Sequence, residues 1–311
     1  MAGEIVALAG GVGAARFLEG TAAVMEPQRL VVIGNTGDDL ELYGLHVSPD
    51  LDTVAYTLAG VANSAKGWGL EGDTFECLAW LKRYTAETWF RLGDRDLATH
   101  LFRTGLLREG QTLSQATAKI CRALGVRARL LPMTDDCLRT KIETDEGRLD
   151  FQVYFVSRRA EPAVRGIALE GAEDARPAPG VLEAIAGAAG IIVCPSNPLI
   201  SIGPILAVPG IRRALGEKKA PVAAISPIVG GRALKGPIDR MMRGVGLEPS
   251  ARQVAEMYRD FVDFFVMDNA DRAEAARVES LGMKAVVTET VMKDKTAKAA
   301  LAKTTLEALG L

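Results

Sequence analysis

The chain has 311 residues, of which 48% are hydrophobic and 24% are charged. This is the composition of a folded globular protein, and it excludes a disordered, collagen-like or coiled-coil description of the whole chain. The 37 basic and 39 acidic residues leave a net charge of −2, which gives no electrostatic reason to expect nucleic-acid binding. The 32 glycines against 2 histidines favour chemistry based on backbone amides and carboxylates over imidazole chemistry.

A nucleotide-binding unit is predicted at the start of the chain. An apolar strand over 5–9 runs directly into Gly10-Gly11-Val12-Gly13, and a helical pattern follows from Ala14 to about Met25. A second strand over 30–33 leads into the polar turn 35–39. Strand, glycine turn, helix and strand form a right-handed βαβ crossover. Glycines let a ligand approach the backbone, and the amides of a helix N-terminus suit a phosphate. Arg16 could add a forked donor. The alternative is a tight turn that holds no ligand.

Four carboxylates follow the second strand, and they favour a hard divalent cation such as Mg²⁺. In an extended segment, side chains two residues apart share a face, so Asp50 and Asp52 are expected to point the same way. The metal would bridge phosphate oxygens that the acids alone repel. The alternative is helix capping, with Ser48 or Asp52 at the start of a helix beginning near Thr53. The four acids are Asp38, Asp39, Asp50 and Asp52.

The middle of the chain differs from its two ends. Residues 73–124 read as consecutive helices, whereas 130–169 reads as β-structure, with 149–155 alternating partly at period two. We therefore expect an inserted helical and β subdomain over 61–175, between core segments 1–60 and 176–311. Within it, Gly93-Asp94-Arg95-Asp96 is predicted to be a loop that enters a helix. Asp94 or Asp96 could cap that helix, and Arg95 could reach a phosphate or carboxylate. His46 and His100 are predicted to be structural.

Four later apolar runs alternate with helix-capable segments, which predicts a parallel sheet buried on both faces. The fold class expected is therefore α/β, with a Rossmann-like parallel sheet. Ligands bind outside the carboxyl ends of such strands. The loop after the first run offers Ser196, Asn197 and Ser201 to a base, sugar or phosphate, although an ordinary turn is an equal alternative. The four runs cover residues 191–193, 222–225, 264–267 and 285–287, and the helical segments cover 180–189, 211–217 and 251–261.

Several classes of protein are disfavoured by motifs that the sequence lacks. There is no P-loop, no G-x-S-x-G elbow, no H-E-x-x-H and no kinase signature set. The interpretation as a nicotinamide dehydrogenase is disfavoured because the glycine spacing does not match G-x-G-x-x-G. Four scattered cysteines, expected to be reduced and buried, form no C-x-x-C pair. The N-terminus lacks a signal-peptide pattern, and no apolar run reaches the roughly 20 residues that span a bilayer. We therefore expect a cytoplasmic protein without membrane or nucleic-acid partners.

Seven motifs in order resemble the 2-phospho-L-lactate transferase family of coenzyme F420 biosynthesis, and the resemblance extends from about residue 5 to 290. One departure is Gly34, where a valine-like residue is expected before the turn. The motifs are Gly10-Gly11-Val12-Gly13-Ala14-Ala15-Arg16-Phe17-Leu18, Asn35-Thr36-Gly37-Asp38-Asp39, Ser48-Pro49-Asp50-Leu51-Asp52-Thr53-Val54, Gly93-Asp94-Arg95-Asp96, Leu131-Pro132-Met133-Thr134-Asp135-Asp136, Pro195-Ser196-Asn197-Pro198 and Ser201-Ile202-Gly203-Pro204-Ile205.

The resemblance implies transfer of a 2-phospholactyl or phosphoenolpyruvyl group from lactyl- or enolpyruvyl-diphosphoguanosine to the deazaflavin Fo. GMP leaves, and the product is coenzyme F420-0 or dehydro-F420-0. The resemblance also implies Mg²⁺, a Rossmann-like core and a homodimer. A non-catalytic regulator that binds a nucleotide sugar is the alternative, because such regulators share the Gly-Gly-Val-Gly start. The motif over 93–96 and the Trp68-Gly69 stretch favour the transferase.

By motif match, the metal would be held by Asp38, Asp39 and Asp50. Catalysis would rest on Asp50, Asp52 and Arg95, with Asp50 or Asp52 accepting the proton of the Fo hydroxyl. Asp50 and Arg95 would lie near the Fo pocket, to which the inserted subdomain contributes, and the glycine turn and the Ser196-Asn197 loop would hold the guanosine diphosphate. The full set expected to bind substrates is Gly10, Gly11, Gly13, Arg16, Asn35, Asp50, Asp94, Arg95, Ser196, Asn197 and Ser201.

Overall fold

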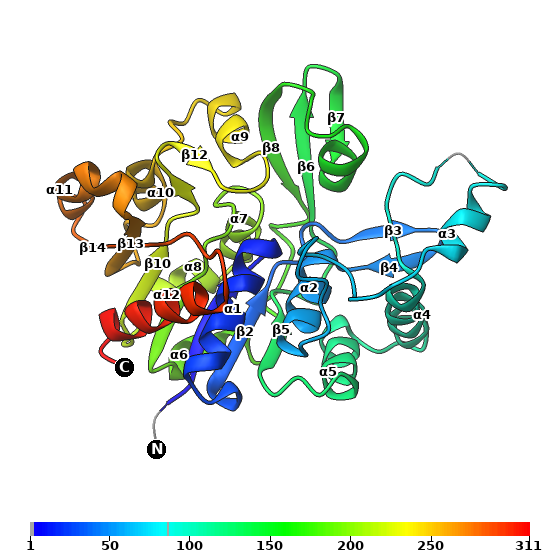
Figure 1. Ribbon diagram of the computed structural model, residues 1–311, viewed down its shortest axis with the longest axis horizontal. Coiled ribbons are helices and arrows are strands. Elements are labelled where there is room, and N and C mark those ends of the chain that lie inside the picture. Colours follow the sequence, from blue (N-terminus) through cyan, green and yellow to red (C-terminus); the bar gives the residue numbers. More distant parts are fainter. Residues whose placement is uncertain (1–2, 86) are drawn as a thin grey trace.

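A seven-stranded sheet forms the centre of the protein, as a computed structural model covering residues 3–85 and 87–311 shows (Figure 1). All neighbouring strands of this sheet are parallel. The predicted α/β fold with a Rossmann-like parallel sheet is thus confirmed. In spatial order, the strands are β5 (Arg129–Pro132), β2 (Leu30–Gly34), β1 (Ile5–Ala9), β9 (Gly190–Val193), β10 (Val222–Ile225), β13 (Phe264–Asp268) and β14 (Lys284–Thr288).

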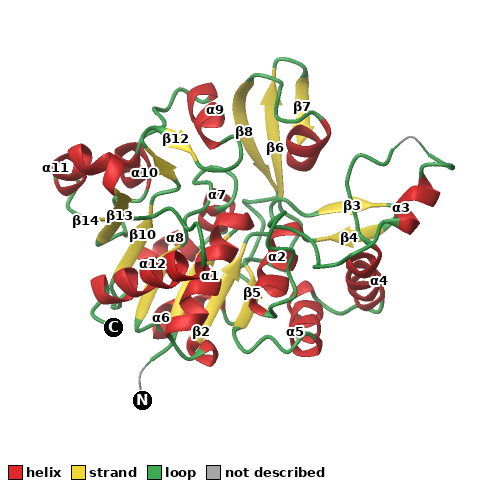
Figure 2. Ribbon diagram, viewed as in Figure 1, coloured by secondary structure: helices red, strands yellow, loops and turns green. Residues whose placement is uncertain are grey.

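Helices cover both faces of the sheet, because every residue of the central strands is apolar or glycine and alternate residues point to opposite faces (Figure 2). On one face, Ile5 and Val32 pack with α1 (Gly11–Val24), α2 (Pro49–Leu58), α5 (Leu113–Ala123) and α12 (Lys295–Ala308). On the other, Val6 and Ile33 pack with α6 (Val181–Gly187), α7 (Ile202–Ala207), α8 (Ile211–Gly216), α9 (Ile238–Gly244), α10 (Ala251–Met257) and α11 (Ala275–Glu279). Single 3₁₀ turns occur at Pro27–Arg29 and Asn269–Glu274.

The chain reverses its direction of winding between β1 and β9. Chain order runs outward from β1 through β2 to β5 on one side, and from β9 through β10, β13 and β14 on the other. Such a reversal opens a crevice at the carboxyl ends of the two central strands, where open α/β sheets bind ligands. The glycine turn after β1 and the loop after β9 therefore flank one crevice.

A helical arm projects from the sheet between β2 and β5, on the right of Figure 1. It consists of the hairpin β3 (Leu40–Leu42) and β4 (Leu45–Val47) with α3 (Glu76–Leu81) and α4 (Asp94–Arg108). Together with α5, these helices confirm the helical prediction for 73–124. The hairpin was not predicted, because each of its strands has only three residues.

A second excursion, between β5 and β9, is the antiparallel sheet β7-β6-β8. Its strands are β6 (Arg139–Thr144), β7 (Gly147–Asp150) and β8 (Val164–Glu170), and α9 packs against β8. A small hairpin of β11 (Ile228–Val229) and β12 (Arg232–Ala233) precedes α9. The strand predicted over 149–155 is wrong after Asp150, where β7 ends and helical structure begins, with a π-helical turn over Val153–Ser157. Phe151 and Phe155 stack four positions apart, a helical spacing that the partial period-two pattern concealed.

The predicted domain boundaries need one correction. Strand β5 belongs to the central sheet, where it pairs with β2, and α5 packs on it. The insertion expected over 61–175 is therefore two separate excursions around a core strand. No helix in the described ranges is long and apolar enough to cross a membrane. Cys121 and Cys194 are buried as expected, whereas Cys77 and Cys137 are exposed.

Candidate functional site

The ends of β1, β2 and β9 bring the glycine turn, the first acidic segment and the Ser196 loop together. The Gly10 backbone N–H donates to Ser196 Oγ over 3.4 Å. A Cβ on Gly10 would lie 2.7 Å from Ser201 Cβ and 2.8 Å from Asp50 Oδ2. Only glycine fits between these side chains, so Gly10 allows the three segments to meet.

The helix that follows the glycine turn begins earlier than predicted, at Gly11 instead of Ala14. Gly11 has a φ of +71°, which favours glycine. A Cβ on Gly13 would lie 2.4 Å from the carbonyl oxygen of Pro195. These glycines allow the N-terminus of α1 to lie directly against the loop after β9.

Asn35 connects the acids to this crevice, and it is fully buried. Its amide nitrogen donates to Asp50 Oδ2 over 2.9 Å and to the Ile200 carbonyl over 3.3 Å. Its amide oxygen accepts from the Gly37 N–H over 2.9 Å. All hydrogen-bonding groups of the side chain are thus used within the protein, so Asn35 orients Asp50 instead of offering a free group to a ligand.

Three of the four predicted acids form a buried group at the end of β2. Burial, followed by the charge of Asp50, raises the pKa of Asp38 well above its ordinary value. Burial also raises the pKa of Asp50 to about 6, although the hydrogen bond from Asn35 opposes part of this shift. Asp39 raises both pKa values further. The three carboxylates therefore lie near one another in a place where negative charge is unfavourable without a proton or a cation.

Two of these acids also keep a free oxygen. Asp38 Oδ1 and Asp39 Oδ1 are buried and have no hydrogen-bond partner in the described part of the chain, and the same holds for the Thr36 hydroxyl. Buried polar atoms are rarely left unpaired, so this group is suited to receive an ion, a water or a ligand. Thr140, on β6, lies beside the same turn: its backbone N–H donates to the Gly37 carbonyl over 2.7 Å, and its buried hydroxyl also has no partner among the described residues. Sequence reasoning missed Thr140, which no motif marks.

The group fits a magnesium ion that is shared with a phosphate. Within residues 3–85 and 87–311, no three Asp, Glu, His or Cys side chains are arranged to hold a metal by themselves. Magnesium is commonly bound by one or two carboxylates, with phosphate oxygens and waters completing its octahedral shell. The unpartnered oxygens of Asp38 and Asp39, with Asp50 beside them, supply donors of that kind.

Asp52 does not share a face with Asp50, which corrects the prediction made for an extended segment. Helix α2 begins at Pro49, so both acids lie in its first helical turn. The carboxylate of Asp52 is bound by both terminal nitrogens of Arg103 on α4. Ser48 occupies the N-cap position without capping the helix by its side chain, and its hydroxyl donates instead to Asp39 Oδ2 over 2.7 Å. Asp52 is thus engaged in a structural ion pair.

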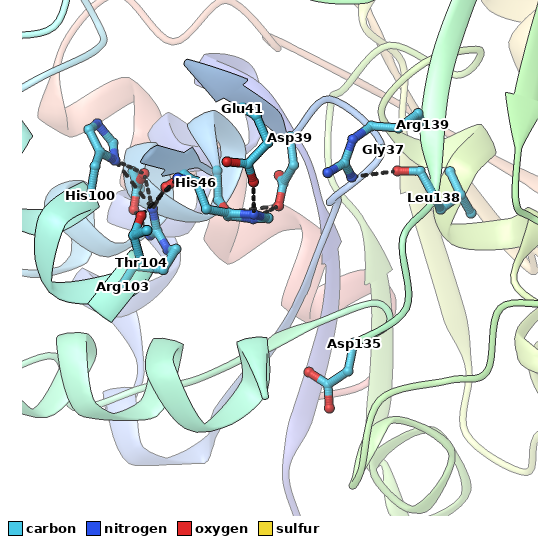
Figure 3. Close-up of polar contacts among 12 residues, drawn as sticks. Gly37, Asp39, Glu41, His46, His100, Arg103, Thr104, Asp135, Leu138 and Arg139 are labelled. Carbon is cyan, nitrogen blue, oxygen red and sulfur yellow. Dashed lines mark hydrogen bonds and ion pairs between the residues drawn. The ribbon is translucent and has the colours of Figure 1, made fainter. Parts of the chain in front are cut away.

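The ion pair belongs to a buried network between α2 and α4, which Figure 3 shows in part. His100 Nδ1 lies 3.7 Å from Asp52 Oδ2, and its Nε2 lies 3.3 Å from Asp96 Oδ1. The Tyr56 hydroxyl donates to Asp96 Oδ1 over 2.8 Å. His100 is therefore structural, as the sequence indicated.

The Asp94 carboxylate caps a helix other than its own. It accepts from the Glu76 and Cys77 N–H groups, both over 2.9 Å, at the start of α3. Asp73 in turn accepts from the Arg95 and Asp96 N–H groups at the start of α4. These reciprocal caps fix the arm.

Arg95 is exposed, and its guanidinium donates to the Glu71 carbonyl over 3.3 Å. The structure does not bring Asp94 or Arg95 into contact with Asp50. Both residues contact instead the segment 71–77. The loop before that segment carries Gly67, where a Cβ would lie 2.7 Å from Val12 Cγ1.

Two cations lie near the first turns of α1. Arg16 is half-buried on that helix, and Lys235 Nζ would lie 3.5 Å from a Cβ on Gly67. Burial and the charge of Arg16 lower the pKa of Lys235. Neither cation has a carboxylate within 4 Å among the described residues. They are thus placed to meet an anion at the mouth of the crevice.

Gly34, the departure from the family pattern, has a packing reason. A Cβ at this position would lie 2.4 Å from Leu51 Cδ2. Leu51 is buried on α2, next to Asp50 in the chain. The missing side chain at Gly34 therefore makes room for the leucine and leaves the acids in place.

Comparisons with known proteins bear on the family and the fold of the chain. A family model described as 2-phospho-L-lactate transferase CofD matches residues 5–307. A phosphoenolpyruvate transferase from Kitasatospora aureofaciens is 47% identical over 310 residues, which cover 97% of each chain. A 2-phospho-L-lactate transferase from Methanosarcina mazei is 41% identical over 288 residues, covering 93% of this chain and 94% of that one. A solved UPF0052 protein from Bacillus halodurans shares the fold, with a TM-score of 0.66, 16% identity and coverage of 98% and 99%.

Proposed function

Because the chain belongs to the 2-phospho-L-lactate transferase family, we propose that it transfers a phosphorylated three-carbon acid from a guanosine-diphosphate-linked donor to the deazaflavin Fo. GMP leaves, and the product is coenzyme F420-0 or dehydro-F420-0. One observation carries this proposal: buried carboxylates with unpartnered oxygens lie against a glycine turn at the switch point of the sheet.

The donor is proposed to bind along the crevice between β1 and β9. Its diphosphate lies at the N-terminus of α1, where backbone N–H groups and the helix dipole favour an anion. Arg16 and Lys235 neutralise the outer oxygens of the diphosphate. The loop after β9 holds the nucleoside, with Ser196, Asn197 and Ser201 as the nearest polar side chains. The existing contacts of Asn197 with Leu199 and Met241 hold that loop in shape.

The acceptor is proposed to enter from the side of the helical arm, with Arg95 on its binding surface. Its terminal hydroxyl attacks the phosphorus next to the three-carbon acid. A new P–O bond forms, the bridging P–O bond to GMP breaks, and the hydroxyl proton passes to Asp50. Without a metal, burial raises the pKa of Asp50 to about 6, and a carboxylate of raised pKa accepts a proton more readily. Positioning and charge neutralisation supply most of the catalysis in such transfers.

Magnesium is proposed to be held by Asp38 and Asp50, with Asp39 as a third contributor. When bound, the ion neutralises the diphosphate and the charge that develops on the leaving GMP. Asp50 is thus a metal contact first and a proton acceptor second. Asp52, which the motif match placed in catalysis, acts in this proposal by joining α2 to α4.

The identity of the three-carbon group is proposed from the relatives. The phosphoenolpyruvate transferases from Kitasatospora aureofaciens and Streptomyces griseus are 47% and 45% identical to this chain. The 2-phospho-L-lactate transferase from Methanosarcina mazei is 41% identical. This difference favours enolpyruvyl-diphosphoguanosine as the donor and dehydro-F420-0 as the product. The family resemblance further favours a cytoplasmic location and a homodimer. Analytical ultracentrifugation of the purified protein tests the homodimer.

The test is incubation with Fo, Mg²⁺ and each of the two donors in turn, followed by mass spectrometry of the product. We expect dehydro-F420-0 from the enolpyruvyl donor at the higher rate. A higher rate with the lactyl donor reverses only the donor assignment. No product from either donor, together with binding of a UDP-sugar and no retention of Fo, supports the regulator instead.

A further inference from the structure

The two oxygens of Asp39 have different surroundings. Oδ2 accepts from the Ser48 hydroxyl over 2.7 Å and lies 3.0 Å from His46 Nε2. Oδ1 is buried and has no hydrogen-bond partner in the part of the chain that the structure describes. The carboxylate is therefore held by one oxygen, and the other oxygen is left free for a ligand.

The free oxygen belongs to the acidic group that the proposed reaction uses. Asp38 and Asp39 are consecutive residues, and each keeps one buried carboxylate oxygen without a hydrogen-bond partner among the described residues. The charge of Asp39 also contributes to the raised pKa of both Asp38 and Asp50. Asp39 itself is only 4% exposed. In the proposed function, Asp38 and Asp50 share the cation with phosphate oxygens, and the unpartnered oxygen of Asp39 is taken to be a neighbouring donor.

His46 is held on several sides. Its backbone N–H donates to the Thr104 hydroxyl over 2.8 Å, and Arg103 Nη1 donates to its carbonyl over 3.5 Å. Across the hairpin, His46 pairs with Glu41, whose Oε1 lies 3.0 Å from Nδ1 of the ring (Figure 3). The ring is thus fixed between two carboxylates, and its position depends on α4.

We propose that His46 is a positioning residue, which binds Asp39 Oδ2 through Nε2 and so fixes Asp39 Oδ1 toward the cation site. This inference rests on the proposed function, which places a divalent cation at Asp38 and Asp50. In this proposal, His46 contacts neither the metal nor the substrate. It acts by restricting rotation of the Asp39 carboxylate, which the Ser48 hydroxyl alone leaves free to turn about that single bond.

The expected loss of metal affinity can be taken from other metal sites in which a neighbouring group orients a metal-binding side chain. Removing a group that orients a metal-binding side chain typically weakens metal binding by about 10- to 100-fold. The geometry also predicts which substitutions succeed. A glutamine amide extends to about the position of Nε2 and can donate to Asp39, whereas an asparagine amide reaches only about as far as Nδ1.

The test compares His46→Gln, His46→Asn and His46→Ala in the full-length protein. The readout is the dissociation constant of Mn²⁺ alone, measured from the electron paramagnetic resonance signal of the free ion. We expect His46→Gln to bind within a few-fold of wild type, and His46→Asn and His46→Ala to bind about 10- to 100-fold more weakly. Circular dichroism establishes that each variant is folded. If His46→Ala does not fold, the comparison of Gln with Asn still decides, because both are amides of similar polarity.

Two results overturn the inference alone, and two overturn more. Wild-type affinity in both His46→Ala and His46→Asn shows that Asp39 needs no support from the ring. Equal losses in His46→Gln and His46→Asn show that the ring only fills space. By contrast, the cation site of the proposed function is itself wrong if wild type binds no Mn²⁺. It is also wrong if Asp50→Asn binds Mn²⁺ as tightly as wild type does.

Discussion

Arg103 and Asp52 form a buried, two-pronged ion pair that joins α4 of the projecting arm to α2. Arg103 Nη1 lies 3.1 Å from Asp52 Oδ2, and the side chains are 1% and 6% exposed. Burial alone lowers the pKa of Arg103, but the charge and hydrogen bonds of Asp52 outweigh it and leave that pKa raised. The same helix α2 carries Asp50. The pair therefore fixes the arm relative to the proposed metal site.

Replacing Arg103 with methionine is expected to destabilise the protein strongly. The substitution leaves the Asp52 carboxylate buried without its partner, and loss of one member of a buried pair costs about 3–5 kcal/mol. Denaturant unfolding measures the loss. The double variant Arg103→Met/Asp52→Leu is expected to recover part of the stability, because no uncompensated charge then stays buried. If the double variant is as unstable as the sum of the two single variants, the pair is not the coupled unit that the structure indicates.

Asp50→Asn is expected to abolish transfer while leaving the protein folded. Asparagine keeps the shape of Asp50, but it removes the negative charge that the proposed metal contact and proton transfer require. Product formation measured by mass spectrometry tests the loss, and circular dichroism tests the fold. Near-normal turnover in this variant would contradict the central assignment of the site.

The same variant gives a pH-dependent prediction. The pKa of Asp50 is raised from 3.8 to about 6 in the folded protein, chiefly by burial. The protonated carboxyl stabilises the fold below pH 4, and this contribution is lost as the pH rises through about 6. Without added metal, Asp50→Asn should therefore melt at a higher temperature than wild type at pH 7.5, and the difference should shrink toward pH 4.5. A difference that is independent of pH would show that Asp50 is not a buried acid of raised pKa.

The sequence predicted the sheet well because its strands are continuous apolar runs. The six strands predicted for the parallel sheet all occur within one or two residues of their predicted bounds. The resemblance drawn from seven ordered motifs is confirmed by the family match. Strand β5 was misplaced because Arg129–Pro132 is short and begins with an exposed arginine. Its assignment to the sheet depends on pairing with β2, which is distant in sequence.

The site was predictable in its residue types more than in its contacts. The sequence identified the acids and the glycines, and the structure brings Gly10, Asp50 and Ser201 together. It could not separate Asp50 from Asp52, because their roles differ only once α2 begins at Pro49. Nothing near Arg103 in the sequence marks it as the partner of Asp52, 51 positions away. The same holds for His46, whose contact with Asp39 depends on an unpredicted hairpin.

The reciprocal caps between α3 and α4 predict a crossed pattern in amide hydrogen exchange. Asp94→Ala removes the acceptor for the Glu76 and Cys77 N–H groups, so these amides should exchange several-fold faster. Asp73→Ala should instead expose the amides of Arg95 and Asp96. Exchange measured by mass spectrometry at the level of single peptides separates the two sites. The same pattern in both variants would mean that the arm opens as one unit and that neither carboxylate acts as a local cap.

Two glycine-to-alanine substitutions should have opposite effects. In Gly13→Ala, the new Cβ would lie 2.4 Å from the Pro195 carbonyl oxygen. Both atoms belong to rigid backbone segments, so the N-terminus of α1 must move away from the loop after β9. Overpacking of this kind typically costs about 1–3 kcal/mol, and we expect GDP binding to weaken as well, because the proposed diphosphate site is displaced.

Gly105→Ala is the matched control, since Gly105 is exposed within α4 and an added Cβ there meets nothing within 4 Å. Alanine in an exposed helix interior is favoured over glycine by about 0.5–1 kcal/mol. This variant should therefore unfold at a higher denaturant concentration and bind GDP as wild type does. Denaturant unfolding and calorimetric titration with GDP measure both quantities in both variants. If Gly13→Ala retained wild-type stability and GDP affinity, the close approach of α1 to Pro195 would not be required for the proposed donor site.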